Sequence, residues 1–320
     1  MPTANVEPSL GDGPLTALVC TCNRPSEIGR IVRSLLQGND RTIELIVVDQ
    51  SDDDLTEQLM RGPEFADRVQ YVRSATRGKG AAMNEGIRLA TSPFVVCTDD
   101  DCEAAPGWVG AMAALLAEHD RVAVAFCRVE APPHDRAIGY VPVYLPDRRR
   151  LMRSALATCP HRGIGAGMVL RRDVVLDLGG MDESFGPGAR FQSGDDWDFE
   201  VRAILKGWHA LETPELAITH HGFRTYAQGR AHTKRDWFAL GGVAAKPLRA
   251  GHPIALLMAL YVVIADAIVP MVVDVVSGRK PSGAQRIVAF GRGYARGLRT
   301  PVDRSTLRYR RVDTPSADGG

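Results

Sequence analysis

The stretch PFVVCTDDDCEAAPGW, residues 93–108, joins a short apolar run to three consecutive carboxylates. The apolar run, residues 94–97, begins after a proline and is too short for a typical helix, so it predicts a buried strand of a parallel sheet. Asp99, Asp100 and Asp101 follow at the carboxyl end of that strand. Because open α/β sheets bind ligands at this edge, we expect a ligand site here.

Adjacent carboxylates repel one another unless a cation offsets their charge, so the cluster favours a divalent metal. Mg²⁺ prefers oxygen ligands and commonly takes one or two carboxylates together with phosphate oxygens and water. The alternative is a solvated acidic turn that caps a helix beginning near Pro106. Taken alone, the three residues leave both interpretations open.

The chain has 320 residues, of which 45% are hydrophobic and 24% are charged. This composition suffices for a buried core and predicts one large globular domain, alone or with an appendage. A formal net charge of +1 gives no overall attraction to nucleic acid. The six cysteines are scattered, which predicts reduced thiols in a cytosolic domain. The first residues lack the basic and apolar regions of a signal peptide, so we expect no cleaved leader.

Apolar runs alternate with helical patterns over the first half of the chain. The predicted strands are residues 15–21, 44–48, 69–72, 94–97 and 122–129. The predicted helices are residues 28–36, 55–60, 82–90 and 108–119. Such alternation indicates βαβ units and a mostly parallel sheet. Polar residues again follow the first two strands: Thr21, Asn23 and Arg24, then Asp49 and Ser51.

A glycine-flanked cation, Gly78-Lys79-Gly80, precedes one of the helical patterns. It does not match the phosphate loop of nucleoside-triphosphate enzymes, because Gly80 follows the lysine where a serine or threonine would stand. A lysine at the start of a helix could still meet a diphosphate electrostatically.

A second acidic cluster lies in SGDDWDFEVRAILKG, residues 193–207. Asp195, Asp196 and Asp198 precede the apolar positions of a helix, where aspartate is favoured for capping. Three carboxylates exceed what capping needs. The functional interpretation is a general base that removes a proton from an incoming hydroxyl.

Residues 131–162 lose regular periodicity and mix prolines, aromatics and arginines. Such a segment is either a substrate-binding lid or a solvated insertion. The small residues 165–167, GAG, would let the backbone approach a ligand closely. His220 and His221 end a later apolar run, where an imidazole either completes a metal site or has a structural role.

Eight pieces of the sequence, in order, resemble the family 2 glycosyltransferases with the GT-A fold. They are TCNRP, VVDQSDDD, RGKGAAMNEGI, CTDDDC followed by PGW, GAGMVLRRD, GGMDESF, GDDWDFEVR and ITHHG, and the resemblance spans roughly residues 15–223. The resemblance implies an α/β, Rossmann-like, mostly parallel sheet with flanking helices. It also implies transfer of a sugar from a nucleotide-sugar donor to a hydroxyl acceptor with inversion at the anomeric carbon, in the manner of bacterial envelope or polysaccharide enzymes.

The resemblance implies a role for each matching residue. The nucleotide and diphosphate would contact Thr21, Asn23, Arg24, Asp49, Ser51, Lys79, Gly80, Asn84, Asp99 and Asp100, and the donor sugar would face Gly165, Ala166 and Gly167. Mn²⁺ or Mg²⁺ would be held by Asp101, Asp99 and His220, with His221 as the fallback. Asp196 would be the catalytic base, and Asp195 would position the acceptor. Ser51 departs from the usual Asn-x-Ser continuation.

The chemistry of glycosyl transfer also requires two separate acidic sites. A metal stabilises the charge that develops on the leaving nucleoside diphosphate, and a base on the opposite face of the sugar deprotonates the acceptor. The sequence offers one cluster at residues 99–101 and another at residues 195–196.

We predict an N-terminal arm at residues 1–14, the catalytic domain at residues 15–245 and a helical appendage at residues 246–320. Residues 252–278 are apolar and long enough to span a bilayer, but Asp266, Pro270 and Asp274 interrupt them. The alternatives are an interfacial or re-entrant helix and a homodimer contact. Basic residues follow: Arg279, Lys280, Arg286, Arg292, Arg296, Arg299, Arg304, Arg308, Arg310 and Arg311. They favour peripheral or monotopic attachment to anionic lipid on the cytoplasmic face.

The resulting hypothesis is a metal-dependent glycosyltransferase at the inner face of the cell membrane. Its donor would be a UDP-, GDP- or dTDP-sugar, and its acceptor a glycan or a lipid-linked molecule. One alternative is a catalytically silent scaffold that binds a nucleotide sugar. A nucleotidyltransferase is the other, although TCNRP lacks the glycine-rich signature expected for it.

Overall fold

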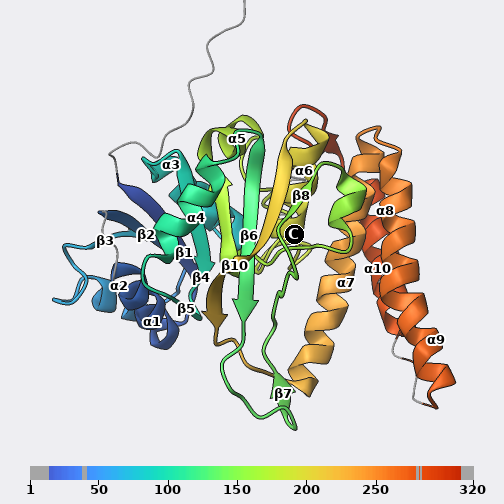
Figure 1. Ribbon diagram of the computed structural model, residues 1–320, viewed down its shortest axis with the longest axis horizontal. Helices are drawn as coiled ribbons and strands as arrows, with labels where there is room; N and C mark the ends of the chain where they lie inside the picture. Colours follow the sequence, from blue (N-terminus) through green and yellow to red (C-terminus); the bar gives the residue numbers. More distant parts are fainter. Residues whose placement is uncertain (1–13, 38–41, 279–280, 282, 311–320) are drawn as a thin grey trace, which may run out of the picture.

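The computed structural model describes residues 14–37, 42–278, 281 and 283–310. Residues 1–13 of the predicted N-terminal arm lie outside these ranges, as do Arg279, Lys280 and Arg311 of the basic segment. A nine-stranded sheet forms the centre of the molecule (Figure 1). Its strands are β1 Leu15–Thr21, β2 Ile43–Asp49, β3 Val69–Arg73, β4 Phe94–Asp99, β5 Cys102–Ala104, β6 Val122–Glu130, β8 Arg150–Met152, β9 Met168–Arg171 and β10 His209–His220.

The order of the strands confirms the expected, mostly parallel α/β sheet with flanking helices. The order is β3-β2-β1-β4-β9-β6-β10-β5, with β8 added to β10. Strands β3, β2, β1 and β4 are mutually parallel, as are β6 and β10, whereas β9 runs antiparallel between β4 and β6. Two short pairs lie outside the sheet: β7 Gly139–Tyr140 with β11 Arg224–Thr225, and β12 Val302–Asp303 with β13 Arg308–Tyr309.

Helices cover both faces of the sheet (Figure 1). They are α1 Pro25–Leu36, α2 Leu55–Met60, α3 Lys79–Leu89, α4 Trp108–Ala117, α5 Arg172–Asp177 and α6 Asp195–Leu205. One apolar core contains Ile31 of α1 and Met112 of α4, and the other contains Met83 of α3. Val19 and Leu18 of β1 belong to different cores, because successive side chains of a strand point to opposite faces. Burial on both faces explains why the strands are continuous apolar runs in the sequence.

Four further helices form the C-terminal part of the molecule: α7 Tyr226–Arg249, α8 Ile254–Val263, α9 Val269–Val276 and α10 Gly283–Arg299. A capping box between Thr225 and Gln228 begins α7. Helices α7 and α10 approach closely because glycines line their contact. A Cβ added to Gly293 would lie 1.8 Å from the carbonyl oxygen of Phe238. Glycine therefore fixes the spacing of this helix pair.

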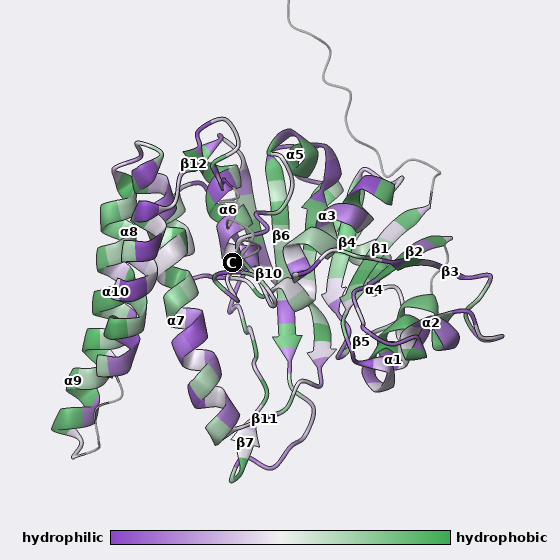
Figure 2. Cartoon of the chain, turned by 180° about the vertical axis from the view of Figure 1, so that it is seen from behind, coloured by the Kyte–Doolittle hydropathy of each residue, from purple (hydrophilic) through white to green (hydrophobic). Residues whose placement is uncertain are grey.

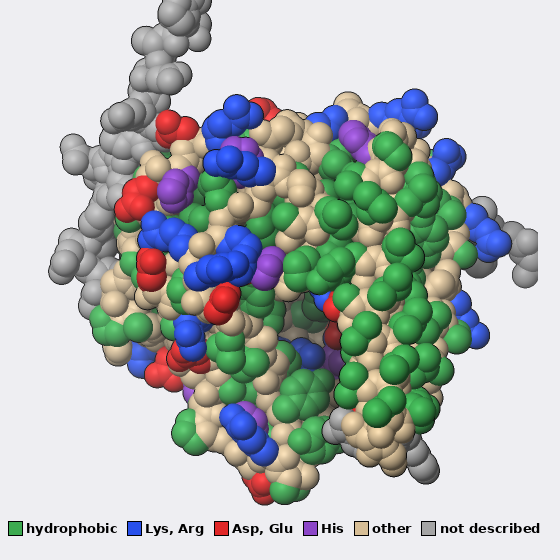
Figure 3. All heavy atoms as spheres, turned by 45° about the vertical axis from the view of Figure 1, so that its right-hand side comes forward, with side chains coloured by type: hydrophobic (Ala, Val, Ile, Leu, Met, Phe, Trp, Pro, Cys, Tyr) green, Lys and Arg blue, Asp and Glu red, His purple; other side chains and the backbone are tan. Residues whose placement is uncertain are grey.

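Helix α8, a π-helical turn Ile264–Ile268 and helix α9 form one helix of 23 residues. Its length and composition suffice to cross a membrane. Only 17% of its most apolar stretch of 18 residues is buried inside the protein. Leu257, Leu260, Val272 and Val276 are each about half exposed or more. Figure 3 shows a nearly continuous apolar surface along the outer side of the C-terminal helices, and Figure 2 shows the contrast with the more hydrophilic N-terminal half of α7.

The polar interruption of this apolar helix faces the protein. The Asp266 carboxylate pairs with Arg162, with 2.6 Å between Oδ2 and Nη2. Pro270 has no N–H to donate to the carbonyl four residues earlier, and that carbonyl, of Asp266, accepts a hydrogen bond from Arg286 Nη1 at 3.1 Å. The arginine of a neighbouring helix thus replaces the missing helical bond.

A buried ionic cluster joins α7 to the sheet domain and to the last described residues. Lys246 Nζ lies 2.8 Å from Asp182 Oδ2 and also pairs with Asp198 of α6. The backbone N–H of Tyr309 donates to the same Asp182 oxygen at 2.7 Å. Helix α7 thus runs without a break across residue 246, where the sequence analysis places a domain boundary.

Candidate active site

A cavity of about 530 Å³ lies at the carboxyl ends of β1 and β4. It is lined by Cys20, Thr21, Cys22, Arg24, Gln50, Arg77, Gly78, Lys79, Asp99, Asp100, Asp101, Pro187, Gly188, His220 and Arg224. Parallel strands place their carboxyl ends at one edge, so residues far apart in the chain meet there.

The first acidic cluster is held by a threonine at the end of β1 and an arginine in the loop that follows. Arg24 Nη1 lies 2.6 Å from Asp100 Oδ1, and Arg24 Nη2 lies 2.8 Å from Asp101 Oδ2. Thr21 Oγ1 donates to Asp100 Oδ2 at 2.7 Å. Burial raises the pKa of Asp100 to about 6, although the charge of Arg24 opposes this shift. The loop between β1 and α1 therefore neutralises the carboxylates that follow β4.

Asp101 faces an imidazole across the cavity. His220 Nε2 lies 3.2 Å from Asp101 Oδ1, and His220 Nδ1 is 3.1 Å from the carbonyl oxygen of Pro142. Burial would raise the pKa of Asp101, but His220 and Arg24 lower it well below its usual range. His221 points elsewhere, with its Nε2 at 3.0 Å from Glu103. The geometry thus favours His220 over His221 as the partner of Asp101.

Lys79 lies between the two acidic clusters. Its Nζ pairs with Asp99, and a Cβ on Gly165 would lie 3.4 Å from that Nζ and 3.8 Å from Asp196 Oδ2. Burial would lower the pKa of Lys79, but the carboxylates of Asp99 and Asp195 raise it well above its ordinary value. One ammonium group therefore compensates charge from both clusters.

The second acidic cluster begins helix α6. Gly194 precedes it with a φ of 77°, a conformation that suits glycine. Asp196 Oδ2 accepts a hydrogen bond from the backbone N–H of Gly165 at 3.0 Å. Burial and the neighbouring Asp195 raise the pKa of Asp196 to about 7. Asp195 and Asp196 are not among the residues that line the cavity, and Asp198 pairs with Arg202 at 2.9 Å inside the protein.

The residues at the cavity fit a divalent cation. Asp101 Oδ1 is buried and accepts no hydrogen bond from a described residue, and it faces His220 Nε2. A Cβ on Gly222 would lie 2.5 Å from His220 Nε2 and 2.8 Å from Asp101 Oδ2, so a glycine keeps this space open. Within the described ranges no group of three His, Cys, Asp or Glu side chains forms a metal site. A carboxylate oxygen suits Mn²⁺ or Mg²⁺, and diphosphate oxygens would complete the coordination of the metal.

Several residues implied by the family resemblance lie behind the cavity wall. Asp49 accepts hydrogen bonds from Ser51 N and from Tyr71 Oη, each at 2.8 Å. Asn84 bonds the backbone of Met181, with its Oδ1 at 2.7 Å from the N–H and its Nδ2 at 3.0 Å from the carbonyl oxygen. In this structure these side chains brace the loops that carry the lining residues.

The other residues that the resemblance implies either line the cavity or support the residues that do. Ser51 Oγ accepts from the backbone N–H of Asn23 at 2.7 Å, which ties the first two strand ends together. Gly80, the second residue of α3, lies against the backbone of Asp182 and Glu183. The backbone N–H of Gly165 donates to Asp196, and Ala166 and Gly167 are buried. Sequence reasoning missed several of the lining residues, namely Cys20, Cys22, Gln50, Arg77, Gly78, Pro187, Gly188 and Arg224. Gln50 and Arg77 lie inside VVDQSDDD and RGKGAAMNEGI, two of the pieces that carry the family resemblance. Their place in these pieces was the sequence feature that could have marked them as site residues.

Solved structures have the same architecture, the GT-A fold. A mannosyltransferase from Pyrobaculum calidifontis, solved with GDP-Man and Mn²⁺, superposes with a TM-score of 0.57 at 19% identity, over 88% of this chain and 86% of that one. The model of Glycosyl transferase family 2 matches residues 16–179, and the chain belongs to this family. Both findings confirm the resemblance seen in the sequence.

Two relatives of known activity align with more than half of the chain. The pre-mycofactocin glycosyltransferase of Mycobacterium tuberculosis is 26% identical over 247 residues, 75% of this chain and 48% of the relative. The glucosyl-dolichyl phosphate glucuronosyltransferase of Haloferax volcanii is 26% identical over 186 residues, 54% of this chain and 57% of the relative. The chain therefore spans about half the length of these relatives.

Proposed function

We propose that this glycosyltransferase moves a sugar from a nucleotide-sugar donor to a hydroxyl of a glycan or lipid-linked acceptor, with inversion and with a divalent metal. The observation that carries the proposal is the position of Lys79 between the acidic cluster that lines the cavity and the acidic start of α6. One cluster is suited to a cation and an anionic leaving group, and the other to proton removal.

The donor diphosphate meets cations that already line the cavity. Arg24, Arg77, Lys79 and Arg224 surround it, and guanidinium groups bind phosphate oxygens in a bidentate manner. Asp101 and His220 would hold Mn²⁺ or Mg²⁺, which stabilises negative charge on the leaving diphosphate as a Lewis acid. The P. calidifontis structure of the same fold contains Mn²⁺, which supports the use of a divalent metal.

Asp196 removes the proton of the acceptor hydroxyl. Its pKa of about 7 suits a base that works near neutral pH. The Gly165 N–H fixes one carboxylate oxygen, and the backbone N–H of Trp197 donates to the other at 2.7 Å. Asp195 is 7% exposed beside it and positions the acceptor. Attack from the side of Asp196, opposite the diphosphate, inverts the anomeric carbon.

The apolar helix supports action at the cytoplasmic face of a membrane. Its exposed leucines and valines lie on one outer surface (Figure 3), and described basic residues follow in α10. An apolar surface beside lysines and arginines binds anionic lipid interfaces. The H. volcanii relative is named for a lipid phosphate acceptor, which agrees with this location.

The proposal is tested by thermal shift of the purified protein with UDP-, GDP- and dTDP-sugars, each with and without Mn²⁺. A ligand that binds the native state raises the melting temperature. We expect a metal-dependent shift with one nucleotide class that disappears in Asp101→Asn and persists in Asp67→Asn, an exposed control. Asp196→Asn should bind the donor but form no product, and NMR of the wild-type product should show an inverted anomeric centre. A full turnover rate in Asp196→Asn would refute the assignment of the base.

A further inference from the structure

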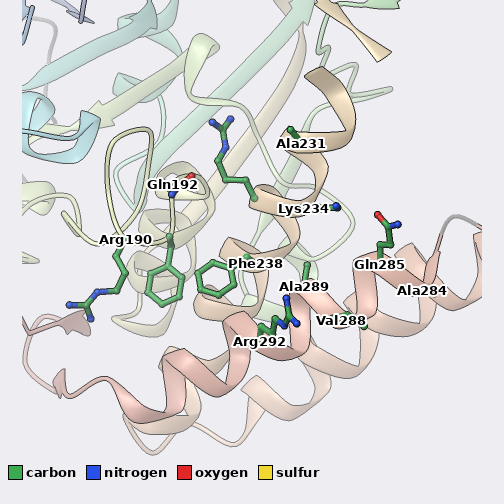
Figure 4. Close-up of a pocket in the computed structure, with 12 residues that line it drawn as sticks. Arg190, Gln192, Ala231, Lys234, Phe238, Ala284, Gln285, Val288, Ala289 and Arg292 are labelled. Carbon is green, nitrogen blue, oxygen red and sulfur yellow. The ribbon is translucent and has the colours of Figure 1, made fainter. Parts of the chain in front are cut away.

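A second cavity, of about 850 Å³, lies between helices α7 and α10 and the segment that leads into α6. Figure 4 shows side chains from all three elements around this space. Its lining contains four cations, Arg190, Lys234, Arg235 and Arg292, and no carboxylate of the described residues. The cavity is therefore strongly electropositive.

These charges are poorly compensated within the described structure. Arg190, Lys234 and Arg292 form no ion pair there. Arg235 has a carboxylate only at 3.9 Å, that of Asp236, and its buried Nε has no hydrogen-bond acceptor among the described residues. Like charges at one site repel one another, so an anion would stabilise the arrangement.

The rest of the wall is apolar. The rings of Phe191 and Phe238 pack with their centroids 5.4 Å apart, and Val288 of α10 is 54% exposed. A ligand that satisfies both parts of the lining carries a negative group joined to a hydrocarbon. A free phosphate would leave the apolar wall in contact with water.

The cavity is separated from the donor site by a single short segment. Pro187 and Gly188 line the donor cavity, whereas Arg190 and Phe191 line the second one. The same segment continues through Gly194 into Asp195 and Asp196, the acidic start of α6. A molecule held in the second cavity thus lies beside the element that carries the base.

The opposite end of the cavity lies near the apolar helix. The first turn of α10 packs against it so closely that a Cβ on Gly283 would lie 2.5 Å from the carbonyl oxygen of Ala267. Ala284 and Gln285 line the cavity immediately after this contact (Figure 4). The cavity therefore extends from the proposed membrane-binding helix toward the catalytic end of the molecule.

We propose that this cavity binds the phosphate or diphosphate of a lipid-linked acceptor. Cations of the lining hold the anion, and Phe191, Phe238 and Val288 contact the start of the hydrocarbon chain. This inference rests on the proposed function in naming the ligand an acceptor, but the binding itself is measured without donor or turnover.

The test uses the full chain and farnesyl phosphate, a short prenyl phosphate, in titration calorimetry. The variant is Lys234→Gln with Arg292→Gln, and the matched control is Arg296→Gln with Arg299→Gln, two exposed cations of α10 outside the cavity. Loss of two charged contacts should weaken binding by about tenfold or more, and the control should bind as the wild type does. Farnesol, which lacks the phosphate, should bind much more weakly.

Three results would overturn the inference. These are equal binding of farnesol, equal binding by the cavity variant, or equal loss in both variants, which would indicate a general surface charge. Sedimentation with phosphatidylglycerol vesicles distinguishes binding of one prenyl phosphate in the cavity from binding to a lipid surface. A surface of anionic lipid should bind both variants alike. The metal-dependent thermal shift with nucleotide sugars should be the same in both variants. Failure of that shift alone would count against the donor site, whereas failure of the titration alone would count against the cavity.

Discussion

The Lys79 ammonium forms an ion pair with the Asp99 carboxylate, and the second acidic cluster lies on its other side. We expect Lys79→Gln to weaken donor binding by about tenfold or more, because a charged contact is lost and Asp99 is left unpaired. Titration with the nucleotide sugar that gives the thermal shift measures the effect. Arg88→Gln, at the exposed end of the same helix, is the matched control. Unchanged affinity in Lys79→Gln would show that the lysine does not contact the diphosphate.

Activity should depend on a single deprotonation near neutrality. Asp196 works as a base only when ionised, and its pKa is about 7 in the free protein. The value of kcat/KM should therefore rise about tenfold per pH unit below that pKa and level off above it. A pH–rate profile measures this, and a profile that is flat through neutrality would contradict it.

Asp196→Asn should be more stable than the wild type at alkaline pH. In the unfolded chain this carboxyl ionises near its ordinary pKa, 3.8, whereas the folded protein keeps the proton until about pH 7. The folded state therefore binds more protons between these values, and stability falls as the pH rises through them. The gain in melting temperature should be larger near pH 8 than near pH 5. An equal gain at both pH values would show that charge is not the cause.

Lys246→Met should be among the most destabilising substitutions in the chain. Lys246, Asp182 and Asp198 are each no more than 2% exposed, so removal of the cation leaves Asp182 buried without its ion-pair partner and leaves Asp198 with Arg202 alone. Breaking such a pair costs about 3–5 kcal/mol of unfolding free energy. Urea denaturation measures the loss, and Arg249→Met, exposed near the end of the same helix, should lose little. A loss in Lys246→Met as small as that of the control would contradict the expected cost.

The apolar helix should govern membrane binding. Leu257→Glu with Leu260→Glu places charges on positions that are 51% and 55% exposed, so the fold should tolerate them. Sedimentation with phosphatidylglycerol vesicles should decrease strongly, because charges are costly in an apolar interface. Leu55→Glu, at a site 53% exposed on α2, should sediment as the wild type does. If all three proteins bound vesicles equally, the helix would have another role.

Much of the fold was predictable because the strands are buried on both faces. The runs that begin at Leu15 and Phe94 contain few polar residues, and each ends where the sheet edge meets the cavity. The rule that ligands bind at the carboxyl ends of parallel strands then places Thr21 near the residues after β4. The structure agrees, since Thr21 donates to Asp100.

The features of the site that the sequence did not predict depend on contacts between residues that are far apart in the chain. Spacing gives no sign that Asn84 would bond Met181, 97 positions away, or that Arg24 would bridge Asp100 and Asp101. The cavity between α7 and α10 was also beyond pattern analysis. It arises where two helices and a loop meet, and neither helix has a motif that marks the meeting point.

The ion pair between Arg162 and Asp266 links the apolar helix to the chain just before Gly165, whose N–H holds Asp196. If the apolar helix rests on lipid, the base cannot move up or down independently of the bilayer. The distance from the lipid surface to the reacting hydroxyl would then be a fixed height, set by the protein. An acceptor would be chosen by how far its hydroxyl stands above the membrane as well as by the identity of its sugar.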